Sequence, residues 1–232
     1  MKIRLKTVDV FAQKAFLGNP LAVFYGDLNL NNEQMQLIAK EIGYSETAFV
    51  LNPEDSNNAA KVRIFSPVSE LPFAGHPNVG VAYVLFKYPE CIPGKSDFKK
   101  LVLEQIAGNV QAVAITDNAG KIIGSEIVAP EIFSSYESLS ITRISKAISL
   151  KEAHIDTKSH KPIIASVGLP FAIVKLKSAE ALSKCETNIT QFRTLDKDFK
   201  YSSDGFSILA YTEEFIPDNG SDLSVKVRVF CP

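Results

Sequence analysis

The sequence predicts an α+β protein of two similar lobes, each made mainly of antiparallel strands around a central helix. Three observations support this prediction: an internal repeat, short apolar segments rich in β-branched residues, and one segment that would be apolar on every side of a helix. The chain has 232 residues, of which 46% are hydrophobic. This is enough for one large domain or for two modest domains with cores of their own.

Three short blocks occur twice in the same order. The pairs are GNPLAVF with GLPFAIV, SETAFV with SILAYT, and KVRIFSP with KVRVFCP. Any single match of this length could arise by chance, but three in one order indicate two halves related by duplication. In this alignment the position of Glu46 is taken by Ile208 in the second half.

The repeated blocks are typical of β-strands, because they are short and rich in Val, Ile and Phe and follow Gly-Pro or Asn-Pro punctuation. The N-terminal segment MKIRLKTVDVFA alternates basic and apolar residues, so it predicts a first strand and not a signal peptide. Residues 117–124 predict a turn between the halves, and residues 217–222 (PDNGSD) predict a hairpin turn. We therefore expect an N-terminal lobe over residues 1–118 and an incomplete C-terminal lobe over residues 119–232.

The segment NNEQMQLIAKEIGY predicts the first helix. Asn31 or Asn32 can cap its start, and Gly43 can end it. Its apolar residues keep helical spacing at Met35, Ile38, Ala39 and Ile42. In the second half, SAEALSKCETNITQFRTL predicts two short helices.

The segment AGHPNVGVAYVLFKYP predicts a helix that is buried on all sides. Pro77 suits the first helical position, where its missing N–H costs nothing. The apolar residues that follow cover almost every side: Val79, Val81, Ala82, Val84, Leu85 and Phe86. Such a helix must run through the middle of its lobe. Gly75, His76 and Asn78 would then lie at its N-terminus, where free N–H groups favour a bound carboxylate or oxyanion.

Composition excludes several classes of function. The formal net charge is −1 and no basic block is present, so we expect no nucleic-acid partner. No apolar run reaches membrane-spanning length, so we expect no membrane association. The three cysteines show no paired spacing, which predicts reduced thiols in a cytoplasmic protein. No cluster has metal-ligand spacing, and both the phosphate loop and the dinucleotide fingerprint are absent, so we expect no metal and no cofactor.

Two residues carry candidate chemistry. Glu46 lies among apolar neighbours, where a carboxylate with a raised pKa can donate or accept a proton; alternatively it is an exposed strand end or a helix cap. His76 would lie at the start of the buried helix, although a lone histidine more often only stabilises a turn. The residues themselves leave both alternatives open.

Taken together, DVFA, GNPLAVF, SETAFV, RIFSP, ELPFAGHPNVG and GLPF resemble the PhzF family of phenazine-biosynthesis-like isomerases, which have the diaminopimelate epimerase-like fold. The resemblance implies two lobes, each a barrel-like sheet around a helix, with the active site between them. It also implies a cofactor-independent isomerase, in which Glu46 moves a proton at carbon and His76 contacts the substrate. The helix N-terminus at Gly75 predicts that this substrate is a small carboxylate-bearing metabolite. The expected substrate-binding residues are Asn19, Ser45, Gly75 and Asn78.

The sequence departs from this family after its second R-x-F-x-P motif. In the family a segment resembling G-x-x-E-D-P-x-T-G-S and a second central helix follow, whereas this sequence stops at RVFCP. We therefore expect a second lobe without its central helix, whose apolar face is covered by a homodimer contact, by a completing second chain or by a rearrangement of the lobe itself. Two alternatives to an active isomerase are an inactive homologue that acts as a binding protein and one piece of a split enzyme. Asn78 also replaces the threonine that is common after GHP.

Overall fold

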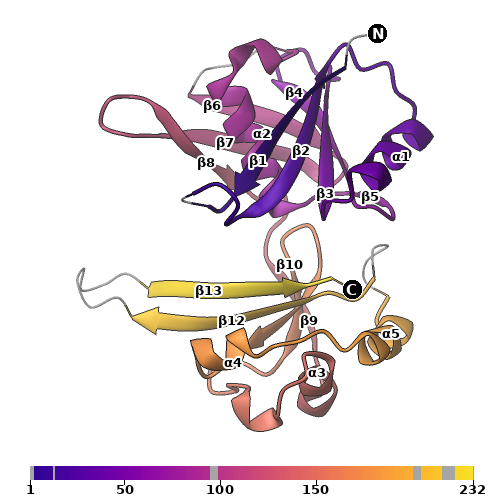
Figure 1. Ribbon diagram of the computed structural model, residues 1–232, viewed down its shortest axis with the longest axis vertical. Helices are drawn as coiled ribbons and strands as arrows, with labels where there is room; N and C mark the ends of the chain where they lie inside the picture. Colours follow the sequence, from indigo (N-terminus) through magenta and orange to yellow (C-terminus); the bar gives the residue numbers. More distant parts are fainter. Residues whose placement is uncertain (1–2, 13, 95–98, 201–204, 216–222, 232) are drawn as a thin grey trace. The chain divides into compact units, whose positions relative to one another are not determined.

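The computed structural model describes residues 3–12, 14–94, 99–200, 205–215 and 223–231. The chain divides into two compact units, Met1–Ile132 and Phe133–Pro232. Each unit contains its own β-sheet and a few helices (Figure 1). The prediction of an α+β fold with two sheet lobes is therefore confirmed.

In the described residues, the first unit holds one eight-stranded sheet. Its strands are β1 (Ile3–Val10), β2 (Asn19–Gly26), β3 (Glu46–Leu51), β4 (Ala60–Phe65), β5 (Glu70–Leu71), β6 (Lys100–Gln105), β7 (Gly108–Thr116) and β8 (Ile122–Val128). The order is β1-β2-β3-β4-β6-β7-β8, and β5 pairs with β4. Strands β2 and β3 run parallel, as do β4 and β6, while the other pairs are antiparallel. The predicted turn at residues 117–124 joins β7 to β8, so β8 belongs to the first unit although it lies beyond residue 118.

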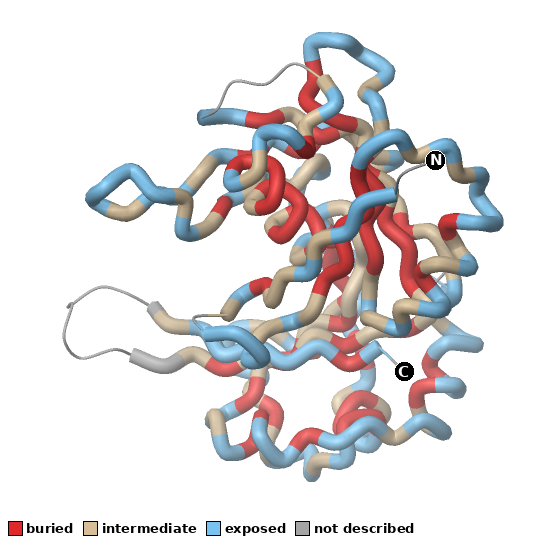
Figure 2. The backbone as a smooth tube through the Cα atoms, turned by 45° about the horizontal axis from the view of Figure 1, so that its top comes forward, coloured by how far each residue is buried: buried red, intermediate tan, exposed pale blue. Residues whose placement is uncertain are grey.

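Helix α2 (Gly75–Lys87) is the core of the first unit. It contacts β1, β2, β3, β7 and β8, and eight of its thirteen residues are buried (Figure 2). This confirms the predicted central helix, although the helix begins at Gly75, which makes Pro77 its third residue and not its first. Gly80 allows a close approach to the sheet, because a Cβ atom there would lie 2.5 Å from Leu21 Cδ2 and 2.8 Å from Val10 Cγ2.

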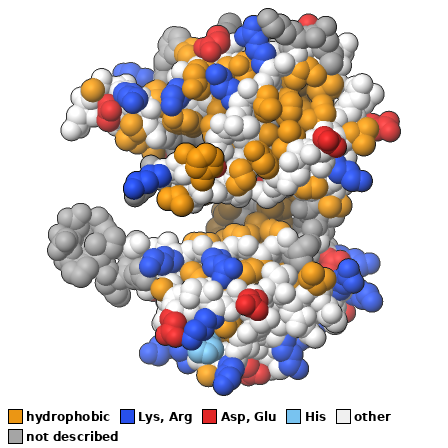
Figure 3. All heavy atoms as spheres, in the orientation of Figure 1, with side chains coloured by type: hydrophobic (Ala, Val, Ile, Leu, Met, Phe, Trp, Pro, Cys, Tyr) orange, Lys and Arg blue, Asp and Glu red, His pale blue; other side chains and the backbone are white. Residues whose placement is uncertain are grey.

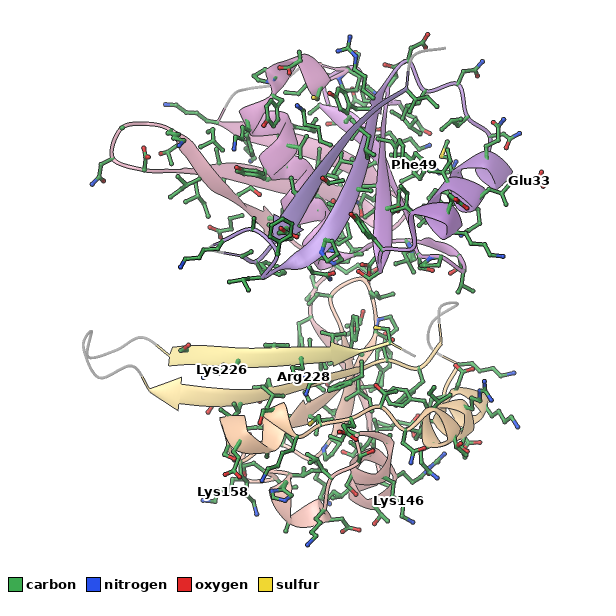
Figure 4. All side chains as sticks on the ribbon, in the orientation of Figure 1. Glu33, Phe49, Lys146, Lys158, Lys226 and Arg228 are labelled. Carbon is green, nitrogen blue, oxygen red and sulfur yellow. The ribbon has the colours of Figure 1, made fainter. Side chains whose placement is uncertain are left out.

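Helix α1 (Asn32–Ile42) packs on the other face of the same sheet. Asn31 caps it in a reciprocal capping box with Gln34, and Gly43 ends it in the left-handed conformation with φ of 68°. Its buried face joins a cluster around Phe49, whereas Glu33 points outward (Figure 4). The short 3₁₀ helix η1 (Pro89–Cys91) follows α2.

The second unit has a five-stranded sheet in its described part, in the order β13-β12-β11-β10-β9. These strands are β9 (Ser134–Ser138), β10 (Ile163–Ser166), β11 (Phe171–Lys175), β12 (Ile208–Phe215) and β13 (Leu223–Phe230). The helical segments are α3 (Ile141–Ala147), η2 (Glu152–His154), α4 (Ala179–Ser183) and α5 (Ile189–Asp198). Helices α4 and α5 are the two that the sequence predicts. The predicted hairpin turn at 217–222 lies outside the described residues, between the antiparallel strands β12 and β13.

The two units repeat one pattern of strand pairing. Strands β2 and β3 are parallel and β4 returns antiparallel, and β11, β12 and β13 repeat this arrangement. The structure corrects the sequence alignment, however. Ala22 pairs with Thr47, while Ala172, at the equivalent position, pairs with Ile208. Ile208 therefore corresponds to Thr47 and not to Glu46. The alignment was wrong by one residue because it matched a shared Ser and Ala and could not detect pairing.

The two sheets differ in how strand faces are covered. Val227 and Val229 of β13 are 48% and 50% exposed, whereas the equivalent residues of β4, Val62 and Ile64, are 3% and 1% exposed. On the opposite side of β13, Arg228 donates hydrogen bonds to carbonyl groups of the α4 region (Figure 4). Apolar side chains follow the edge of the second unit where β13 runs (Figure 3). The described helices of this unit thus pack against the face opposite the valines.

Replacing Gly80 with alanine should destabilise the first unit. The new methyl group would collide with Leu21 and Val10, and overpacking of this kind typically costs about 1–3 kcal/mol. The better helix propensity of alanine recovers roughly 1 kcal/mol of that loss. Urea unfolding should show a lower midpoint for Gly80→Ala. Gly124→Ala is the matched control, since its Cβ would meet Ile115 at an ordinary 3.6 Å; equal midpoints for both variants would contradict tight packing at Gly80.

Candidate active site

Three elements of the first unit meet at the candidate site. Asn19 is the first residue of β2 and Glu46 is the first residue of β3. Because these neighbouring strands are parallel, their starting ends lie at the same edge of the sheet. His76, the second residue of α2, reaches this edge from the helix N-terminus.

The side chains of four residues form a chain of close contacts. Ser45 Oγ donates a hydrogen bond to Asn19 Oδ1 at 3.0 Å. Asn19 Nδ2 lies 3.3 Å from His76 Nδ1, and His76 Nε2 lies 3.3 Å from Glu46 Oε2. The structure therefore brings together four of the six residues that the sequence predicts for the site.

His76 and Glu46 are partly buried, with 11% and 19% of their side chains exposed. Burial lowers the pKa of His76 from 6.5 to about 4, because the charged imidazolium is poorly solvated there. The ring is thus neutral at physiological pH. The 3.3 Å contact brings Nε2 within reach of the carboxylate, but the two atoms are not aligned as in a hydrogen bond, and Nε2 has no hydrogen-bond partner among the described residues.

Gly75 leaves the start of α2 open beside His76. It is exposed, and a Cβ atom at this position would meet nothing within 4 Å. The residue before the helix, Ala74, offers no side-chain cap to the first N–H groups of α2. A helix N-terminus without a cap suits a carboxylate or another anion, since its N–H groups and dipole both favour negative charge.

Asn78 has a structural position, in contrast to its predicted role in substrate binding. It is completely buried, and its Nδ2 donates to the Ala74 carbonyl at 2.9 Å while its Oδ1 accepts from Gln105. These contacts tie the first turn of α2 to β6. Sequence reasoning missed Gln105 because no motif surrounds it. Ser125, similarly unmarked, donates to the Val79 carbonyl at 2.7 Å and fixes the same helix to β8.

Other chemistry has little support in the described part of the chain. No group of three or more His, Cys, Asp or Glu side chains there is arranged to hold a metal ion. Cys91 and Cys185 are buried free thiols, and burial raises the pKa of each. None of the described helices is long and apolar enough to span a membrane.

The fold is shared with solved structures of other proteins. The chain superimposes on a probable proline racemase of Agrobacterium radiobacter K84 with a TM-score of 0.57 at 11% identity, over 97% of this chain and 70% of that one. At this identity the match establishes a shared racemase-like and epimerase-like fold. Residues 8–232 match the family of phenazine biosynthesis-like proteins, PhzC-PhzF, so the chain belongs to this family.

Two further comparisons agree with this assignment. The structure of a Bacillus anthracis phenazine biosynthesis protein of the PhzF family matches with a TM-score of 0.72 at 24% identity, over 98% of this chain and 72% of that one. The trans-2,3-dihydro-3-hydroxyanthranilate isomerase of Pseudomonas aeruginosa is 39% identical over 127 residues, which are 55% of this chain. That match spans 42% of the length of the relative.

The lowered pKa of His76 predicts a specific dependence of stability on pH. Between about pH 4 and pH 6.5 the unfolded chain binds a proton at this residue and the folded chain does not. The free energy of unfolding should therefore fall as the pH is lowered through this window, by at most about 1.4 kcal/mol per pH unit from this residue. Urea unfolding between pH 7 and about pH 4.5 should show a flatter pH dependence for His76→Gln than for the wild type. Parallel curves for the two proteins would contradict the lowered pKa.

Proposed function

We propose that this chain is an isomerase that moves a proton between carbon atoms, or between the two faces of one carbon, with Glu46 as the general acid and base. The observation that carries the proposal is the pairing of the Glu46 carboxylate with a neutral His76 at the start of an enclosed helix. Membership of a family whose relatives include named isomerases supports it. Neither residue needs a metal or an organic cofactor for this chemistry, so the proposed reaction is cofactor-independent.

Each group has a distinct role in the proposed reaction. Glu46, as a carboxylate, accepts the proton from carbon and returns it at the new position. Removal of that proton places negative charge on a neighbouring oxygen of the substrate. A neutral histidine can donate a hydrogen bond to such an oxygen without first losing a proton, which is the role proposed for His76. Asn19 and Ser45 line the site beside it.

We propose a small carboxylate-bearing metabolite as the substrate. The uncapped N-terminus of α2 at Gly75 offers N–H groups and a positive dipole end to a carboxylate. The Pseudomonas aeruginosa relative is named for an anthranilate, which is also a carboxylate. We further propose a cytoplasmic location, which the free thiols of Cys91 and Cys185 support.

The exposed valine face of β13 is proposed as an assembly surface. The equivalent face of β4 is buried in the first unit. Because β13 has the same pattern of side chains, its valine face is also suited to burial against a partner. Either a second copy of the chain or a completing second chain would cover Val227 and Val229. The alternative function, an inactive homologue that binds a ligand, shares this surface and differs from the isomerase only in lacking turnover.

Glu46→Gln should abolish most proton exchange. The substitution preserves size and hydrogen bonding but removes the titratable proton, and general acid–base catalysis by one group is typically worth about 10² to 10⁴ in rate. Deuterium incorporation from heavy water into cyclic β-amino acids such as trans-2,3-dihydro-3-hydroxyanthranilate would be followed by NMR. Glu33→Gln, at an exposed position of α1, is the matched control, because it makes the same change of side chain away from the site.

Three outcomes of this assay separate the hypotheses. Exchange by the wild type that is lost in Glu46→Gln supports the proposed isomerase. Equal exchange by both proteins would refute the role of Glu46. Binding of the carboxylate without any exchange would overturn the isomerase and favour the binding protein.

The wild type should sediment as more than a monomer, and the double variant Val227→Thr/Val229→Thr should shift toward the monomer. Threonine keeps the β-branched shape but adds a hydroxyl group that resists dry burial. Val113→Thr, at a 40% exposed position in the first unit, is the matched control. A wild-type monomer that binds a dye for exposed apolar surface would exclude the homodimer and favour a different chain as the partner of this face. A monomer that binds no such dye would contradict the assembly surface.

A further inference from the structure

In the contacts that lead from Ser45 through Asn19 and His76 to Glu46, each side chain donates toward the next. The Nδ2 group of an asparagine can only donate, so the His76 Nδ1 that faces it at 3.3 Å must accept. A neutral imidazole with an accepting Nδ1 carries its proton on Nε2. This places the Nε2–H of His76 on the side of Glu46.

At the Ser45 end of this series of contacts, the donors and acceptors can also be satisfied in the opposite direction. If the Asn19 amide were rotated by 180°, its oxygen would accept a hydrogen bond from a protonated His76 Nδ1 and its nitrogen would donate one to Ser45 Oγ. The hydroxyl of Ser45 can serve either arrangement, because it both donates and accepts. The contact between Ser45 and Asn19 therefore does not by itself determine the tautomer of His76.

Glu46 selects between the two arrangements. An ionised carboxylate only accepts hydrogen bonds. With the proton on Nδ1, the lone pair of His76 Nε2 would face Glu46 Oε2 at 3.3 Å in a partly buried site, which is repulsive. With the proton on Nε2, the same contact is attractive. The carboxylate at one end and the donor amide at the other thus favour the same tautomer.

We propose that Asn19 is a positioning residue that, together with the Glu46 carboxylate, holds His76 as its Nε2–H tautomer, with the Nε2–H on the side of Glu46 and the substrate. Asn19 Nδ2 donates to His76 Nδ1, and the hydrogen bond from Ser45 to Asn19 Oδ1 is compatible with this direction of the amide. The inference rests on the proposed function for its catalytic meaning, since the Nε2–H would donate to the substrate oxygen. The tautomer itself is a property of the resting protein and does not depend on turnover.

The tautomer can be read directly from ¹⁵N chemical shifts. The chain has three histidines, so long-range ¹H–¹⁵N spectra of protein labelled at histidine can be assigned with a His76→Gln variant. At pH 7 the wild type should show His76 with a bare Nδ1 and a protonated Nε2. Asn19→Asp replaces the donor with a group that only accepts, so Nδ1 should become protonated. Glu46→Gln replaces a group that only accepts with an amide that can also donate, so it should give a mixture of tautomers. Ser45→Ala leaves both Glu46 and the Asn19 donor in place, so it should keep the wild-type tautomer.

Several results would overturn the inference. These are a wild-type His76 protonated on Nδ1, an Asn19→Asp variant whose Nδ1 stays bare, and a Glu46→Gln variant whose His76 stays entirely in the wild-type tautomer. Asn19 and Ser45 are both exposed and Glu46→Gln preserves side-chain size, so the variants should fold, which circular dichroism would check. Where turnover is measurable, Asn19→Asp should lower kcat by on the order of 10² with a smaller change in KM. Absence of turnover in the wild type would overturn the proposed function and leave the spectroscopic result intact.

Discussion

Helix α2 has almost no polar side, and the rest of the first unit depends on keeping it from water. A helix that is apolar all round can be buried only if other elements enclose it. The sheet does this by curving around α2, so that strands β1 and β2 at one end of the sheet and β7 and β8 at the other all contact the helix. Its N-terminus is the exception, because free N–H groups need polar partners. The helix therefore opens to solvent at Gly75, and the site residues gather at that opening.

The sequence predicted much of this arrangement. Apolar periodicity located α1 and α2, and the repeated blocks located the strands that carry Asn19 and Glu46. Parallel pairing of β2 and β3 then places those two residues beside each other, a consequence of topology that short motifs only suggest. The contact between Asn78 and Gln105 was beyond prediction, because it depends on the distant strand β6 entering the sheet beside β4.

The corrected alignment changes the meaning of the duplication. Glu46 corresponds to Ser207, so the second half carries a small polar residue where the first carries its carboxylate. A strand start that accepts a polar side chain in both halves is a shared property of the scaffold. The proton-transfer chemistry proposed for the first half depends on the added residues His76 and Asn19, which lie on α2 and β2. The repeat therefore preserves a polar residue at this strand position, and the residues around the position determine which chemistry the polar group can carry out.

Burial in the repeated strands is determined by what packs on each face and not by the strand sequence. Arg63 and Arg228 occupy the same repeat position, and both turn toward helices: Arg63 bonds Asn32 at the start of α1, and Arg228 bonds carbonyls near α4. Since side chains alternate along a strand, fixing the arginine on the helical side sends the neighbouring valines to the other side. That side is enclosed in the first unit, where Val62 is buried, and exposed in the second, where Val227 is half in solvent. An alternating pattern thus predicts a strand and its two faces, while only the tertiary partner decides whether the apolar face becomes core or contact surface.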